Sequence, residues 1–186
     1  PHLYAILLAT IAGASIPLGA WLARFPALIP RWMEDEFRHT VIAFGGGALF
    51  SAIALVLVPE GAERLSPPAA LGWFCAGGVV FGLVDHLLSK AGGHDAQFMA
   101  MMLDYLPEAM ALGAMLAGDP GVALLLAGLI ALQNLPEGFN AWREMAAGGG
   151  SPRLFWLFVA MVPVGPLAAI LGLMVLNDAQ PVLGAI

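Results

Sequence analysis

Residues 154–177 read LFWLFVAMVPVGPLAAILGLMVLN, a run of 24 residues that contains no charged side chain between Arg153 and Asp178. A helix needs about 20 apolar residues to cross the roughly 30 Å hydrocarbon core of a bilayer, so this run predicts a membrane-spanning helix. The whole chain agrees, because 60% of its 186 residues are hydrophobic and only 11% are charged. Soluble domains carry about a quarter charged residues. The composition therefore excludes a soluble domain.

Five further runs have the length of a membrane span. Three of them are uncharged over most of their length, and the other two contain acidic residues. Because irregular backbone cannot face lipid, we expect an all-α, polytopic transmembrane helix bundle that forms a single domain over residues 1–186. Its six helices are expected at residues 3–23, 40–59, 65–88, 96–118, 120–142 and 154–177.

Basic residues indicate how such a bundle lies in the membrane. Alternating spans place six Lys and Arg residues on one side and only Arg64 on the other. Since Lys and Arg concentrate in cytoplasmic loops, the N-terminus is expected outside the cytoplasm, in a bacterial inner (plasma) membrane. The chain has seven Lys and Arg against thirteen Asp and Glu, which excludes a nucleic-acid-binding protein because such proteins need a basic face. The expected partner surface is the lipid bilayer.

Two of the predicted spans carry a related motif. Residues 104–108 read DYLPE, and residues 133–137 read QNLPE. The first and fifth residues of each motif are four positions apart, so both lie on one face of their helix. Ionisable groups inside a bilayer are costly and usually face a cavity or a partner. The two motifs therefore predict a functional site.

The turn between the two helices sets the depth of both motifs. Counted from Pro120, Glu108 is twelve residues away and Gln133 thirteen, while Asp104 is sixteen away and Glu137 seventeen. At about 1.5 Å per residue the two motifs reach matching depths near the middle of the bilayer. We therefore expect a cluster of three carboxylates and one amide.

A bound cation is the expected counter-charge for this cluster. Carboxylates that lie close together repel one another unless they are protonated or neutralised, and no Lys or Arg lies in the middle of a span. Oxygen ligands suit divalent ions of the Mn²⁺, Fe²⁺, Zn²⁺ or Cd²⁺ class, here as substrate, with no organic cofactor. Two other interpretations stay open: carboxylates that share protons and only hold the helices together, and a proton relay for another substrate.

At these residues the chain resembles the ZIP family of divalent-metal transporters. That family carries a His-Asn-x-Pro-Glu-Gly type motif in its fourth helix and a His/Gln-x-x-Pro-Glu motif in its fifth. The resemblance extends to residues 57–60, LVPE, at the end of the second span and to Asp85 near the inner end of the third. Family members have eight helices, so we expect this chain to be a fragment or a shortened member that lacks the last two.

The resemblance implies a principal metal site and departs from the family at several positions. Asp104 stands where the family usually has a histidine, which favours harder ions. Tyr105 replaces an asparagine ligand, and Gly165 stands where the sixth helix often has glutamate, so a second, adjacent metal site is expected to be degraded. The metal ligands that the resemblance implies are Asp104, Glu108, Gln133 and Glu137, with Asn134 in the place of a frequent acid.

The predicted function is the transport of divalent metal ions (zinc, iron, manganese or cadmium) toward the cytoplasm. We expect no enzymatic activity, because the chain lacks the Gly-x-Gly-Asp, Gly-x-Ser-x-Gly and His-Glu-x-x-His signatures. The alternative is a ZIP-like membrane protein that senses metal or has a structural role without transport. A homodimer is left open as the assembly.

Overall fold

The computed structural model describes residues 2–25, 34–91, 93–147 and 152–175, and every regular element in these ranges is a helix. The all-α class is therefore confirmed for the described part of the chain. In chain order the elements are α1 (His2–Leu22), α2 (Glu34–Ala52), the π-helical segment η3 (Ile53–Leu57), α3 (Val58–Arg64), α4 (Pro67–Ala91), α5 (Gly93–Met115), α6 (Pro120–Ala147), α7 (Pro152–Met161) and α8 (Val164–Val175).

Five helical stretches of the described chain are long and apolar enough to cross a membrane. The 23-residue helix α5 is not among them, although it has the length of a span. Polar residues at its start, together with Asp104 and Glu108, lower its hydropathy. The five stretches are Leu3–Leu22, Glu36–Arg64, Pro67–Lys90, Pro120–Ala146 and Arg153–Val175. Several apolar helices of this length indicate a membrane-embedded protein.

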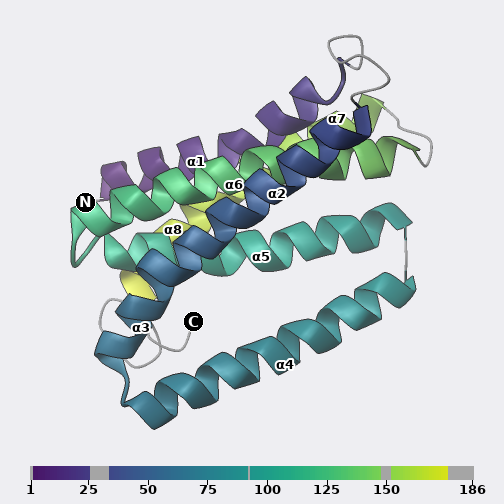
Figure 1. The fold of residues 1–186 in the computed structure, drawn as a ribbon. Coiled ribbons are helices and arrows are strands. Elements are labelled where there is room, and N and C mark those ends of the chain that lie inside the picture. Colours follow the sequence, from purple (N-terminus) through teal and green to yellow (C-terminus); the bar gives the residue numbers. More distant parts are fainter. Residues whose placement is uncertain (1, 26–33, 92, 148–151, 176–186) are drawn as a thin grey trace.

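The helices form a bundle around α1 and α6, which pack along most of their length (Figure 1). Helix α8 packs against both α1 and α5, and α2 crosses α6 (Figure 1). Helix α4 lies apart along the outside of the bundle and contacts mainly α5 (Figure 1). No residue of α4 with a described side chain is buried, so its apolar side chains face outward.

Buried apolar residues form two main clusters at different levels of the bundle. One contains Ala5, Leu8, Ala9 and Ala12 of α1 with α6 residues from Ala123 to Ile130. The other contains Ile16 and Ala20 of α1 with Ala141 and Met145 of α6. Along α6, the motif at residues 133–137 therefore falls between the two apolar clusters. The polar residues of the motif lie at the middle of the bundle.

Glycines allow the central helices to approach closely. A Cβ atom on Gly138 of α6 would overlap the backbone of Ile16 in α1, and one on Gly19 of α1 would overlap the backbone of Leu135 in α6. Helices α5 and α8 meet in the same way, with Gly113 against the backbone of Ala169. Small residues at such crossings are typical of membrane helices, where close van der Waals packing drives association.

The second span differs from the expected helix at residues 40–59. The helix begins at Glu34, because charged residues end the apolar span without ending the helix. Near its other end the backbone widens into a π-helical segment in which the N–H of Val58 donates to the carbonyl of Ile53. The next residue, Pro59, has no N–H and cannot continue the ordinary pattern, which explains the local change. The helix then continues as α3 to Arg64.

The last span is not the single helix expected at residues 154–177. It is divided into α7 and α8 at residues 162 and 163. Pro163 cannot donate a backbone hydrogen bond, and the N–H of Val162 bonds to Val159 three residues earlier, at 3.1 Å. The break faces α1, since a Cβ on Gly13 would lie 3.3 Å from the carbonyl oxygen of Val162. Residues 176 and 177 of the expected span lie outside the described residues.

Candidate functional site

Helices α5 and α6, which carry the two motifs, are joined by a turn whose geometry follows from its sequence. The side-chain Oδ1 of Asp119 accepts hydrogen bonds from the backbone N–H groups of Gly121, at 2.7 Å, and Val122, at 3.3 Å. Asp119 thus caps the first turn of α6, and Pro120 occupies the first helical position, where its missing N–H is not needed. This fixed turn sets the register between the two motifs.

Glu108 and Gln133 meet in the interior of the bundle. The Nε2 of Gln133 donates a hydrogen bond to Oε1 of Glu108 at 2.6 Å. Both side chains are buried, with exposed fractions of 6% for Glu108 and 4% for Gln133. The prediction that these two residues of the motifs lie at the same level of the helix pair is therefore confirmed.

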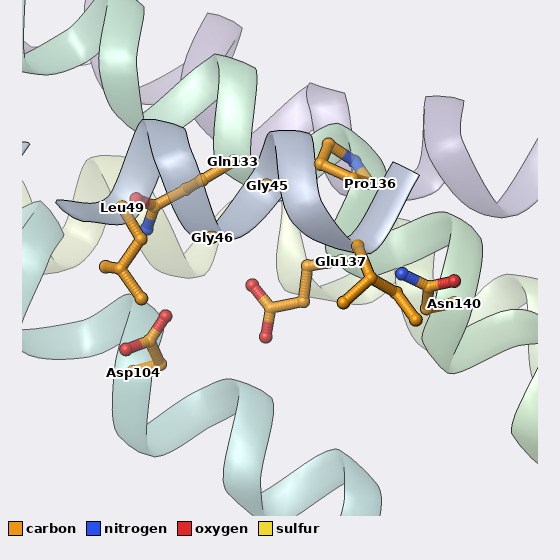
Figure 2. A pocket seen from close by; sticks show the side chains of 9 residues that line it. Gly45, Gly46, Leu49, Asp104, Gln133, Pro136, Glu137 and Asn140 are labelled. Atoms are coloured by element: carbon orange, nitrogen blue, oxygen red, sulfur yellow. The ribbon is translucent and has the colours of Figure 1, made fainter. Parts of the chain in front are cut away.

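The second pair of motif residues lines a cavity of about 270 Å³. Figure 2 shows the carboxyl groups of Asp104 from α5 and Glu137 from α6 pointing into one space beside α2. The amide of Gln133 reaches the same space (Figure 2). The other lining residues are Ile42, Gly45, Gly46, Leu49, Pro136 and Asn140.

Four buried acceptor oxygens of the described protein have no hydrogen-bond partner. They are Oε1 of Gln133 and Oδ1 of Asn140, whose residues line the cavity, and Oε2 of Glu108 and Oδ1 of Asn134, whose residues do not. Buried polar atoms are nearly always paired, so orphaned acceptors require an explanation such as a bound ion or water. Gln133 is the most informative of these side chains, because it is almost fully buried and lines the cavity.

The three motif carboxylates do not converge on one point. Within the described residues there is no group of three His, Cys, Asp or Glu side chains that could hold one metal ion together. Glu108 is turned toward the Gln133 amide and does not line the cavity. Instead of the expected cluster of three carboxylates, two carboxylates line the cavity, and the third, that of Glu108, is hydrogen-bonded to the amide of Gln133.

Asn134, the remaining predicted ligand, lies on another face of α6. It is fully buried, and its Nδ2 donates a hydrogen bond to the backbone carbonyl of Ala12 in α1 at 3.0 Å. It is not among the residues that line the cavity. Its observed contact holds α6 against α1.

Tyr105, which stands in place of the family's asparagine ligand, is also turned away from the cavity. Its hydroxyl lies 3.5 Å from the carbonyl oxygen of Ala9. Gly13 of α1 and Gly165 of α8 make room for it, since a Cβ on either glycine would overlap the hydroxyl. The ring of Tyr105 therefore inserts between α1 and α8, where it belongs to an apolar cluster.

Helix α2 supplies a wall of the cavity that the motif pattern did not predict. A Cβ on Gly45 would lie 2.8 Å from Cγ of Pro136, so α2 approaches the second motif at its proline. Gly46 has no neighbour within 4 Å of such a Cβ and borders the cavity (Figure 2). The run of three glycines at residues 45–47 was the available signal, but in an apolar helix it indicates packing as readily as a site.

Comparison of the chain with models of known protein families and with curated proteins found no match.

Proposed function

We propose that this protein transports divalent metal ions across a membrane toward the cytoplasm, and that the cavity between α2, α5 and α6 binds the ion in transit. The observation that carries the proposal is the pair of carboxylates from different helices, Asp104 and Glu137, which share a cavity with Gln133, a residue whose amide oxygen is buried and unpaired in the described protein. The lining residues include no Lys or Arg, so nothing on the cavity wall neutralises these charges. A cation in the cavity would do so.

The same proposal includes the topology and the family. With α5 counted as a span, the chain has six, and the distribution of Lys and Arg favours an N-terminus outside the cytoplasm of a bacterial inner membrane. The paired Pro-Glu motifs support membership of the ZIP family. An ion held at the depth of these motifs would need alternating access to the two sides.

Metal uptake into proteoliposomes tests the proposal. The chain would be reconstituted with an ion-sensitive dye inside, and the initial uptake of Zn²⁺, Fe²⁺, Mn²⁺ and Cd²⁺ measured for wild type, Glu137→Gln and Asp104→Asn. Each variant removes one charge at nearly constant volume, and we expect uptake to fall by about tenfold or more. Glu63→Gln is the matched control, because Glu63 is exposed on α3 and does not line the cavity. Unchanged uptake in Glu137→Gln would reject the cavity as the transport site.

A structural role is the second candidate, and the Glu108–Gln133 hydrogen bond favours it. This bond joins α5 to α6 directly in the interior. A protein of this kind would bind metal without moving it, or would not bind it at all. Metal binding by the purified protein together with no uptake by any proteoliposome would favour this candidate over the transporter.

A further inference from the structure

The donor atoms around the cavity are all oxygens. They come from the carboxylates of Asp104 and Glu137 and from the amides of Gln133 and Asn140, and the other lining residues are apolar. The nearest sulfurs before Asp104 in sequence, those of Met101 and Met102, belong to side chains of an apolar cluster, and neither residue lines the cavity. Thiolate and imidazole ligands favour zinc and softer ions, whereas carboxylates, carbonyl-type oxygens and water suit Mg²⁺, Ca²⁺ and Mn²⁺.

The amide oxygens of two lining residues have no hydrogen-bond partner in the described protein. Gln133 uses Nε2 for its bond to Glu108, which leaves Oε1 buried without a partner in the described protein. Oδ1 of Asn140 is unpaired in the same way. Because Gln133 is only 4% exposed, its orphaned oxygen is not simply turned toward solvent.

The number of carboxylates and the size of the cavity indicate how an ion is held. Only two carboxylates line it, and the described residues contain no cluster of three acidic, His or Cys side chains. A cavity of about 270 Å³ has room for an ion and several waters, since a water occupies about 30 Å³ in the liquid. Mg²⁺ is bound in this manner, through one or two carboxylates, while it keeps several of its waters.

We propose that the ion carried by this cavity is a hard divalent cation, Mg²⁺ or Mn²⁺, bound with part of its water shell and preferred over Zn²⁺ and Cd²⁺. This inference rests on the proposed transport function and specifies its substrate. Asp104 and Glu137 supply the charge, the Gln133 and Asn140 oxygens supply neutral ligands, and waters complete the coordination.

Uptake measurements in proteoliposomes test the preference. At equal free concentrations we expect Mn²⁺ to enter at least about tenfold faster than Zn²⁺, and Mg²⁺ to compete with Mn²⁺. Uptake of Zn²⁺ at a rate equal to or above that of Mn²⁺ would overturn this inference and leave metal transport standing. Failure of any divalent ion to enter would instead reject the transport function.

A substitution that adds a nitrogen ligand gives a second test. Asn140→His places an imidazole on the cavity wall, and we expect the ratio of Zn²⁺ to Mn²⁺ uptake to rise by about tenfold. Leu132→His is the matched control, because Leu132 is exposed on α6 and does not line this cavity. An unchanged ratio in Asn140→His, with a folded protein confirmed by gel filtration, would contradict the proposed ligand set.

Spectroscopy of bound Mn²⁺ tests the water shell without relying on transport. Electron–nuclear double resonance of the Mn²⁺-loaded protein in detergent should show proton couplings of coordinated water that disappear in D₂O. In the variant Glu137→Gln, we expect Mn²⁺ binding to be lost, and these couplings with it. Bound Mn²⁺ without exchangeable proton couplings would overturn the hydrated form of binding.

Discussion

Gln133 has two roles at the residue scale. Its Nε2 donates a hydrogen bond to one oxygen of the buried Glu108, and its Oε1 is buried without a hydrogen-bond partner in the described protein. The amide thus contacts Glu108, which does not line the cavity, and belongs to a residue that does. An amide suits this position because one end donates a hydrogen bond while the other end accepts or binds a cation.

Removing one partner of the Glu108–Gln133 hydrogen bond should cost more than removing both. Gln133→Met leaves Glu108 buried without its donor, and we expect the free energy of unfolding to fall by about 1–3 kcal/mol. The double variant Glu108→Met/Gln133→Met replaces both polar groups and should recover most of that loss. Unfolding by sodium dodecyl sulfate in bicelles measures both values. A double variant whose loss equals the sum of the single losses would show that the two side chains are not coupled.

How far the site could be predicted differs from residue to residue. The depth of Glu108 and Gln133 followed from counting residues from Pro120, because two helices joined by a tight turn rise together. The direction in which Asn134 points did not follow, because it depends on how α6 is rotated against α1. Neighbouring positions in one motif can face different helices, and only the packing of the bundle decides between them.

At the scale of elements, the crossing of α1 and α6 depends on glycine. Gly19 and Gly138 each face the partner helix's backbone, so the two helices touch without intervening side chains. This contact fixes the position of the second motif along α1, between the two apolar clusters. The position of the cavity therefore depends on residues that do not line it.

Adding one methyl group to this crossing should destabilise the fold. Gly138→Ala would force Cβ into the backbone of Ile16, and such overpacking costs about 1–3 kcal/mol. Gly128→Ala is the matched control on the same helix, since its Cβ would have no neighbour within 4 Å. Thermal unfolding in detergent should show a lower midpoint for Gly138→Ala alone. Equal midpoints for the two variants would mean that α1 and α6 are not in close contact.

Helix boundaries were predictable where the end of an apolar run is also the end of the helix, and not elsewhere. Charges near Arg38 end the apolar run, but the helix extends back to Glu34 because polar residues are also compatible with a helix. Pro59 and Pro163 lie inside uncharged runs, where hydropathy carries no information about the backbone. The π-helical segment and the break between α7 and α8 follow from proline chemistry, which a charge-based division into spans ignores.

At the scale of the whole molecule, α4 defines an outer surface. Its side chains are not buried by the rest of the described chain, and several are large and apolar, such as Phe74, Val80 and Leu83. In water so large an apolar surface would be unfavourable, whereas in a bilayer it faces hydrocarbon. The exposed helix therefore agrees with a membrane environment.

Labelling of Cys75 tests this placement. Cys75 is a free, exposed cysteine about two turns into α4, where lipid should shield it and oppose formation of the reactive thiolate. In nanodiscs we expect a water-soluble maleimide to modify it at least about tenfold more slowly than a cysteine at position 66, introduced as Ser66→Cys with Cys75→Ala. Position 66 is exposed in the turn between α3 and α4. Equal rates in nanodiscs would argue that α4 is in water.

The interruption at residues 162 and 163 has a mechanical consequence. A continuous helix bends only by sacrificing backbone hydrogen bonds, but here Pro163 has already removed one. Bending the span at this junction therefore costs less than bending a continuous helix. The junction lies beside Gly13 of α1, and the same glycine faces the hydroxyl of Tyr105 in α5. The point at which the span bends most easily is thus next to the helix contact that Tyr105 makes.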